Sequence, residues 1–202
     1  MTAATEITII GAGPVGALMS IFLARRGLAV TIHERRPDMR RVAIPAGRSI
    51  NLALANRSIH ALEQVGLMET VNPHLIPMRG RMIHHGDGKQ ELQPYGNKPV
   101  EVIYSVSRGE LNKLLMDAAE AAGVVIRFNA RCESLDLAQR ELVLVDEAGG
   151  RTVPFEVLIG ADGGGSVVRA AIAAATAGEV TEDRLGHGYK ELTIPPAPGG
   201  GF

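Results

Sequence analysis

Six residues near the start of the chain constrain its fold more than any other segment. Residues 11–16, Gly-Ala-Gly-Pro-Val-Gly, follow the apolar run 7–10 and precede an apolar helical pattern. The first glycine allows a tight strand-to-helix turn, the second lets the backbone approach a pyrophosphate, and the third allows close packing of helix on strand. Glu34 ends the next apolar run, where a carboxylate can accept hydrogen bonds from a ribose. The pattern predicts a dinucleotide-binding β-α-β unit; the alternative is an ordinary tight turn in an α/β protein.

Composition limits the remaining choices. The 202 residues are 46% hydrophobic with a net charge of -1, which suits one domain, or one domain plus part of another, and argues against a nucleic-acid surface. The single cysteine, Cys132, excludes an internal disulfide, so the expected location is the cytoplasm. Residues 7–24 carry no charge, but their three glycines and one proline, and the lack of basic residues before them, argue against a signal peptide or membrane span.

Helical periodicity indicates three of the expected helices. The first is predicted over residues 14–26, and its expected buried face is Val15, Leu18, Met19, Phe22 and Leu23. The second covers residues 56–65, and the third begins at the capping box 107–110 and ends at Gly123.

Strands are expected on both sides of the third helix. Residues 102–106 and 124–128 would form a second β-α-β passage with that helix, which favours a parallel sheet. Residues 135–155 read instead as a small antiparallel excursion.

A hairpin is expected where residues 81–85 and 90–95 flank an Asp-Gly turn. Folding about Asp87 and Gly88 would place Arg81 and Tyr95 opposite each other, or within one residue of it. An arginine fork suits a carboxylate, and a tyrosine hydroxyl can add a hydrogen bond. The alternative is an exposed arginine and a half-buried core tyrosine.

A second glycine-rich strand-to-helix turn spans residues 157–169 and contains Asp162. An acid at the end of a buried strand, followed by glycines, can hold a ribose or pyrophosphate. The alternative is a structural turn that enters a helix near Ser166. A local basic concentration could meet a cofactor phosphate or form a solvated face; its members are Arg25, Arg26, Arg35, Arg36, Arg40, Arg41 and Arg48.

These motifs, in this order, resemble the flavin-dependent aromatic hydroxylases, single-component monooxygenases that bind FAD. Within them, segments 47–54, 78–84, 94–96, 105–108 and 187–196 are similar to the kynurenine 3-monooxygenase family. The resemblance implies an FAD-binding Rossmann-like parallel sheet with helices, plus antiparallel strands of an incomplete substrate domain. The FAD-binding domain would comprise residues 1–75 and 100–184, and the partial substrate sheet residues 76–99 and 185–202.

The resemblance also implies roles for individual residues. Arg81 and Tyr95 would hold the substrate's carboxylate. The residues that would bind FAD are Gly11, Gly13, Val15, Gly16, Glu34, Arg35, Ala53, Arg108, Cys132, Asp162 and Gly163.

The reaction implied is the conversion of L-kynurenine to 3-hydroxykynurenine in tryptophan degradation and NAD biosynthesis. NADPH would reduce FAD, and the reduced flavin would take up O2 to give a C4a-hydroperoxide that attacks the ring. No side chain is expected to act as catalyst, the six histidines included, because the flavin carries the chemistry.

Family members extend well beyond the final residues of this chain, so we expect either a fragment of a longer enzyme or completion by a second chain. The sequence leaves open a homodimer. Two other functions also stay open: an FAD-dependent reductase on the same scaffold, and an FAD-binding module without activity.

Overall fold

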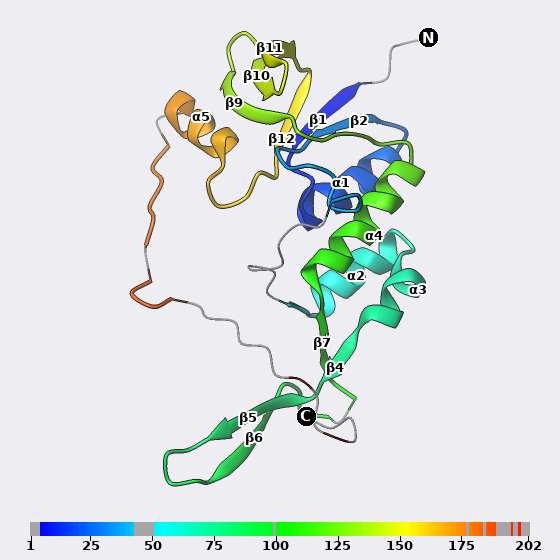
Figure 1. Cartoon of the computed structure of the whole chain (residues 1–202), viewed down its shortest axis with the longest axis vertical. Coiled ribbons are helices and arrows are strands. Elements are labelled where there is room, and N and C mark those ends of the chain that lie inside the picture. Colours follow the sequence, from blue (N-terminus) through cyan, green and yellow to red (C-terminus); the bar gives the residue numbers. More distant parts are fainter. Residues whose placement is uncertain are drawn as a thin grey trace.

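The computed structural model describes residues 5–42, 51–98, 100–176, 178–183 and 185–188, together with Pro195 and Pro198. A four-stranded sheet with the order β12-β1-β2-β8 forms its centre, and all its neighbouring strands are parallel. These strands are β1 (Glu6–Ile10), β2 (Ala29–His33), β8 (Val125–Arg127) and β12 (Val157–Gly160). Helix α1 (Pro14–Ala24) connects β1 to β2 and packs on α4 (Arg108–Ala121), as Figure 1 shows. The predicted first β-α-β unit and the α/β class are therefore confirmed.

Alternation along the parallel strands divides the core into two layers. Ile9 of β1 and Ile32 of β2 are fully buried in the cluster shared with α1 and α4. The next residue of β1, Ile10, belongs instead to a second cluster with residues of the antiparallel excursion. Because successive strand residues point to opposite faces, helices cover one face of the sheet and the excursion covers the other.

The buried face of α1 differs from the predicted one. Its fully buried residues are Gly16, Ala17, Ser20 and Ile21. Val15 is 71% exposed and Met19 is 41% exposed, whereas the other three predicted residues are partly buried against the core. The helix is apolar on nearly all sides, so its periodicity selects no face. The small side chains decide the packing because they let the helix approach the sheet closely.

The predicted second β-α-β passage is wrong. Strand β7 (Ile103–Val106) pairs antiparallel with both β3 (Leu52–Leu54) and β4 (Ile76–Met78) in a separate three-stranded sheet, while β8 joins the parallel sheet. Helix α4 therefore carries the chain from one sheet to the other over about 21 Å. The helix itself was predicted correctly, and the Glu110 N–H donates to the Ser107 side chain at 3.4 Å.

Short helices lie beside this second sheet. Helix α2 (Asn56–Gln64) ends before Gly66, as predicted, and Gly66 has a φ of +59°. Helix α3 (Met68–Val71) and the 3₁₀ turn η1 (Asn72–His74) follow it and lead into β4.

The antiparallel excursion is confirmed. It is a three-stranded sheet with the order β11-β10-β9, made of β9 (Arg131–Asp136), β10 (Glu141–Asp146) and β11 (Gly149–Pro154). Helix α5 (Val167–Thr176) packs against β9. The second core cluster consists of Ile10, Cys132, Leu142, Leu144 and Val168.

The hairpin of β5 (Gly80–His84) and β6 (Gln90–Pro94) extends from the end of the molecule opposite the excursion (Figure 1). Its register corrects the sequence prediction: Arg81 lies opposite Gln93, and the Tyr95 N–H bonds the Arg79 carbonyl. Arg81 and Tyr95 are thus two positions out of register. The cause is the length of the turn. The His85 N–H bonds the Lys89 carbonyl, so three residues, 86–88, form the turn between them. A two-residue turn would have shifted the pairing by one.

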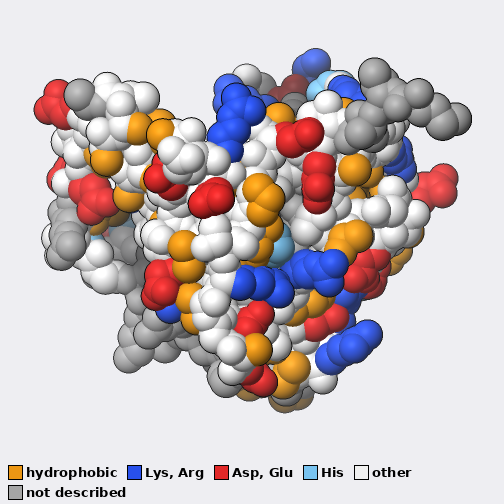
Figure 2. All heavy atoms as spheres, turned by 90° about the horizontal axis from the view of Figure 1, so that it is seen from above, with side chains coloured by type: hydrophobic (Ala, Val, Ile, Leu, Met, Phe, Trp, Pro, Cys, Tyr) orange, Lys and Arg blue, Asp and Glu red, His pale blue; other side chains and the backbone are white. Residues whose placement is uncertain are grey.

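Two of the predicted features lie outside the described residues: Arg48, and residues 189–194 of the predicted partial substrate sheet. Within the described residues, no helix combines the length and the apolar character needed to cross a bilayer. Acidic and basic side chains are interspersed over the face seen in Figure 2, in line with the net charge of -1.

Candidate dinucleotide site

The turn between β1 and α1 needs glycine at two positions for packing and leaves the third open. Gly11 has a φ of +102°, and a Cβ there would lie 2.4 Å from the Ala161 carbonyl oxygen. A Cβ at Gly16 would lie 2.0 Å from the Gly11 carbonyl oxygen. A Cβ at Gly13 would meet nothing within 4 Å. No side chain caps the first turn of α1, so its N–H groups can receive an anion at this open position.

Glu34 is fixed beside this turn through both its backbone and its side chain. Its carboxylate accepts the Ala12 N–H at 2.8 Å on one oxygen and the Arg36 N–H at 2.9 Å on the other. Its own N–H and carbonyl bond Arg127 and Ala130. Each carboxylate oxygen has a further lone pair. The half-buried carboxylate can therefore accept ribose hydroxyls while it keeps its bonds to the turn.

Asp162 caps helix α5. One carboxylate oxygen accepts the Ser166 hydroxyl at 2.6 Å, and the other accepts the Val167 N–H at 2.7 Å. Gly163 follows with a φ of +87° and is exposed. The structural alternative for this turn is thus realised in part, because the acid stabilises the start of the helix that follows it.

The two glycine-rich turns are adjacent in space, although about 150 residues separate them in the sequence. The Ala161 N–H bonds the Ile10 carbonyl at 2.8 Å, directly before Gly11. Parallel pairing of β1 with β12 brings their carboxyl ends together. This edge of the sheet is where ligands of open α/β folds bind.

The other predicted cofactor residues occupy three places. Val15 and Arg35 are exposed near the first turn and Glu34. Ala53 lies opposite Ser105 in the second sheet. Ser105 is close in sequence to Arg108, which starts α4. Ala53 and Arg108 are both exposed. These two are therefore held at the far end of α4 from β8.

Apart from Gly11 and Gly16 of the first turn, Cys132 is the predicted cofactor residue that the structure buries. Its thiol lies in the second core cluster and is 7% exposed. Burial, with a smaller contribution from the Asp162 carboxylate, raises the pKa of the Cys132 thiol. The side chain is near the second turn but is neutral and packed in the core.

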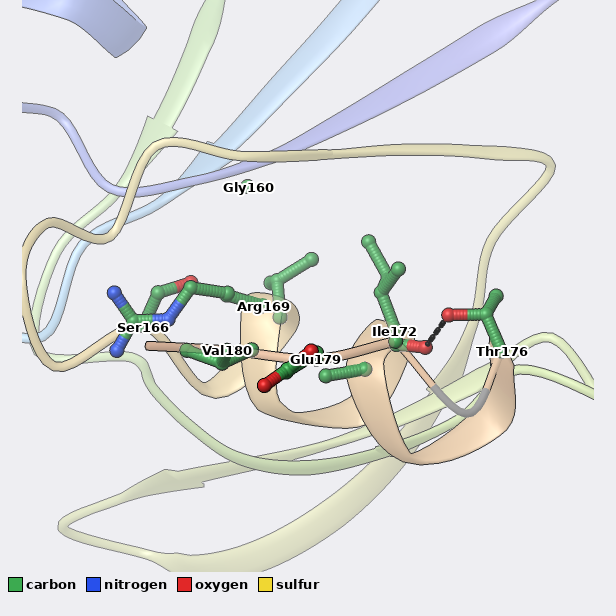
Figure 3. Close-up of a pocket in the computed structure, with 10 residues that line it drawn as sticks. Gly160, Ser166, Arg169, Ile172, Thr176, Glu179 and Val180 are labelled. Atoms are coloured by element: carbon green, nitrogen blue, oxygen red, sulfur yellow. Dashed lines mark hydrogen bonds between the residues drawn. The ribbon is translucent and has the colours of Figure 1, made fainter. Parts of the chain in front are cut away.

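A groove of about 380 Å³ is lined by residues of α5 and by Gly178, Glu179 and Val180 (Figure 3). Ile172 and Val180 contribute apolar surface to it, and the Thr176 hydroxyl donates to the Ile172 carbonyl at 2.8 Å. Gly160 lines its inner end. None of the predicted site residues lines it, although Gly160, Ser166, Val168 and Arg169 belong to the second glycine-rich segment.

Comparison with known proteins identifies the type of domain. A family model described as "FAD binding domain" matches residues 4–187. The chain belongs to this FAD-binding domain family. The open glycine turn, Glu34 and the second turn all lie within the matched residues.

Two curated relatives carry the same name. Kynurenine 3-monooxygenase of Myxococcus xanthus is 51% identical over 97% of this chain and 43% of the relative. Kynurenine 3-monooxygenase of Xanthomonas oryzae pv. oryzae is 46% identical over 98% of this chain and 44% of the relative. This FAD-binding domain chain thus spans less than half the length of these curated relatives.

Solved structures confirm the fold. The flavin-dependent monooxygenase PieE, in complex with FAD and substrate, superposes with a TM-score of 0.70 over 85% of this chain and 32% of that chain at 22% identity. The p-nitrophenol 4-monooxygenase PnpA of Pseudomonas putida gives 0.69 over 84% and 43% at 20% identity. The FAD-binding domain described above is thus built on the flavoprotein monooxygenase fold.

Proposed function

We propose that this chain carries the FAD-binding part of a flavin-dependent hydroxylase that converts L-kynurenine to 3-hydroxykynurenine with NADPH and O2. The observation that carries the proposal is its 51% and 46% identity, over nearly its whole length, to proteins named kynurenine 3-monooxygenase. The aligned region includes the hairpin segment as well as the FAD motifs, because 97% or more of the chain is covered.

The described residues fit FAD at the first turn. The space at Gly13 admits a pyrophosphate, the uncapped N-terminus of α1 offers N–H groups to it, and Glu34 accepts the adenosine ribose. The remaining predicted cofactor residues would line the rest of the molecule. They are Gly11, Val15, Gly16, Arg35, Ala53, Arg108, Cys132, Asp162 and Gly163. When bound, FAD supplies the hydride acceptance and oxygen activation that no side chain offers.

Arg81 and Tyr95 would bind the carboxylate of L-kynurenine. They share one face of the hairpin as diagonal neighbours, since Arg81 pairs with Gln93 and Tyr95 lies two residues further. Diagonal neighbours on a sheet are about 7–8 Å apart, within reach of one ligand for side chains of this length. Gln93 accepts the Arg81 Nε–H at 2.5 Å, which orients the guanidinium. A guanidinium has five N–H donors, so a bidentate bond to a carboxylate remains feasible.

In this proposal the parallel sheet and the hairpin have different roles. The residues of the parallel sheet bind and orient the cofactor, and the hairpin orients the substrate through its amino-acid end. The aromatic ring of the substrate is then free to face the flavin. Protein groups contribute position and electrostatics, and no described side chain is assigned a proton transfer.

The test is oxygen transfer. The chain is loaded with FAD, freed of unbound flavin and supplied with NADPH, L-kynurenine and isotopically labelled O2. We expect mass spectrometry to find one labelled oxygen atom in the product, 3-hydroxykynurenine. Oxidation of NADPH without labelled product would instead establish a reductase. Retained FAD without NADPH oxidation would establish a binding module. Kynuramine, which lacks the carboxylate, is the matched substrate control.

A further inference from the structure

Arg40 is the centre of an ion cluster that joins the loop after β2 to helix α4. Its guanidinium bonds Asp38 in the same loop at 2.8 Å, and it bonds Asp117 and Glu120 of α4 at 2.8 and 2.6 Å. It also lies over the Phe128 ring, 5.6 Å from the centroid. The Arg40 side chain is only 17% exposed. Three carboxylates and one aromatic ring therefore hold the guanidinium in a single position.

The charges of this cluster stabilise one another. Hydrogen bonds from Arg40 lower the pKa of Asp38 despite its burial. The bonds to Asp38 and Glu120 raise the pKa of Arg40 above its ordinary value. Both directions favour the charged forms of Asp38 and Arg40. The sequence around Arg40 gave no sign of the cluster, because the two carboxylates of α4 lie about 80 residues away.

Two further contacts hold the same loop. The Asn112 side-chain amide of α4 contacts the Met39 sulfur at 3.3 Å. The Asn129 N–H donates to the Arg36 carbonyl at 3.1 Å. The loop is thus tied to α4 at its far end and to the residues after β8 at its near end.

This loop supplies one of the two N–H groups that hold the Glu34 carboxylate. The Arg36 N–H donates to one Glu34 oxygen at 2.9 Å, and the Ala12 N–H of the glycine turn donates to the other. Displacement of the loop would release the first of these bonds. The carboxylate would then rotate away from the orientation in which it faces the turn.

We propose that Arg40 is a positioning residue for the adenosine half of FAD: by tying the loop 35–42 to α4, it holds the Glu34 carboxylate in the orientation that receives the ribose. The inference rests on FAD binding at the first turn and not on the identity of the hydroxylated substrate. Arg40 belongs to the local basic concentration of the sequence, and in this proposal it acts through Glu34 and not by contact with the cofactor.

The experiment compares matched variants of the whole chain. Arg40→Gln removes the cluster's cation, and Arg40→Lys keeps the charge without the planar fork. Arg41→Gln is the control, because Arg41 is adjacent, is 86% exposed and only approaches Asp38 at 3.7 Å. The double variant Asp117→Asn, Glu120→Gln breaks the same ties from α4, where both side chains are substantially exposed, so it keeps the fold if Arg40→Gln does not.

Binding of FAD and of ADP is measured by equilibrium dialysis, and ADP represents the adenosine half alone. We expect Arg40→Gln and the α4 double variant to weaken both ligands by the same factor, about tenfold, the loss of one hydrogen bond to a charged group. Arg40→Lys should restore part of this loss, and Arg41→Gln should stay within about twofold. The urea midpoint of each variant is measured as well. If Arg40 only stabilised the fold, a variant with an unchanged urea midpoint would bind ADP as tightly as the unaltered chain.

Three results would overturn the proposal. One is unchanged FAD affinity in a folded Arg40→Gln chain or in the double variant. Another is a loss with FAD that ADP does not share. A third is failure of ADP to compete with FAD on the unaltered chain, because the adenosine half would then contribute no affinity to lose. Absence of FAD binding by the unaltered chain would refute the proposed function itself, and this inference with it.

Discussion

The sharpest pH dependence is expected from His33, at the end of β2. The residue is 6% exposed, and its Nδ1 atom has no hydrogen-bond partner among the described residues. It lies opposite Ile10 of β1 and Arg127 of β8, on the sheet face that the antiparallel excursion covers. Burial, then the charges of Arg151 and Arg127, lower the pKa of His33 from 6.5 to about 4.

The sign of the effect follows from that direction. The folded chain keeps His33 neutral down to about pH 4, whereas the unfolded chain protonates it near 6.5. The unfolded state therefore binds more protons between these values, and the free energy of unfolding falls as the pH falls through this window. The gap corresponds to a loss of about 3 kcal/mol from this one residue.

Urea unfolding at about pH 7 and about pH 4 measures the loss. His33→Leu removes the titrating ring, and His60→Gln is the control, because the His60 side chain is 70% exposed. We expect His33→Leu to lose about 3 kcal/mol less stability between the two pH values than either the unaltered chain or His60→Gln. Equal losses in all three would show that His33 is not held neutral, and would refute the reasoning.

Three further predictions concern the two turns and the hairpin. Gly13→Ala should leave the free energy of unfolding within about 0.5 kcal/mol but weaken FAD binding at least about tenfold, whereas Gly16→Ala should cost about 1–3 kcal/mol, since only its Cβ meets backbone; equal destabilisation in urea would contradict this. Asp162→Ala should lower the free energy of unfolding by about 1 kcal/mol through loss of the α5 cap, and no change in the urea midpoint would argue against a capping role. Tyr95→Phe should weaken L-kynurenine binding about fivefold, and Arg81→Gln more, by flavin difference titration; an undiminished affinity in both would exclude the hairpin as the carboxylate site.

Local features of the fold could be predicted because short-range interactions decide them. The turn at Gly11, the Ser107 cap and the stop at Gly66 each depend on a few neighbouring residues. Strand partners depend on contacts across the whole chain, which is why β7 was assigned to the wrong sheet. The hairpin register failed for a smaller reason, one additional residue in its turn.

The candidate site divides in the same way. That Gly13 and Glu34 lie at one turn could be predicted, because the strand, turn, helix and acid follow one another at fixed spacing. The ion cluster around Arg40 could not be predicted, since its two partners on α4 are set by tertiary packing. The buried state of Cys132 is likewise decided by residues of β10 and α5.

The most direct test of the account is the visible spectrum of the purified chain after FAD has been added and unbound flavin removed. We expect a retained flavin band that L-kynurenine shifts and kynuramine does not, if the glycine turn holds the cofactor and Arg81 binds the substrate's carboxylate. A chain that is folded by circular dichroism but retains no flavin would contradict the assignment of the turn, and a retained band that both molecules shift equally would contradict the assignment of the hairpin.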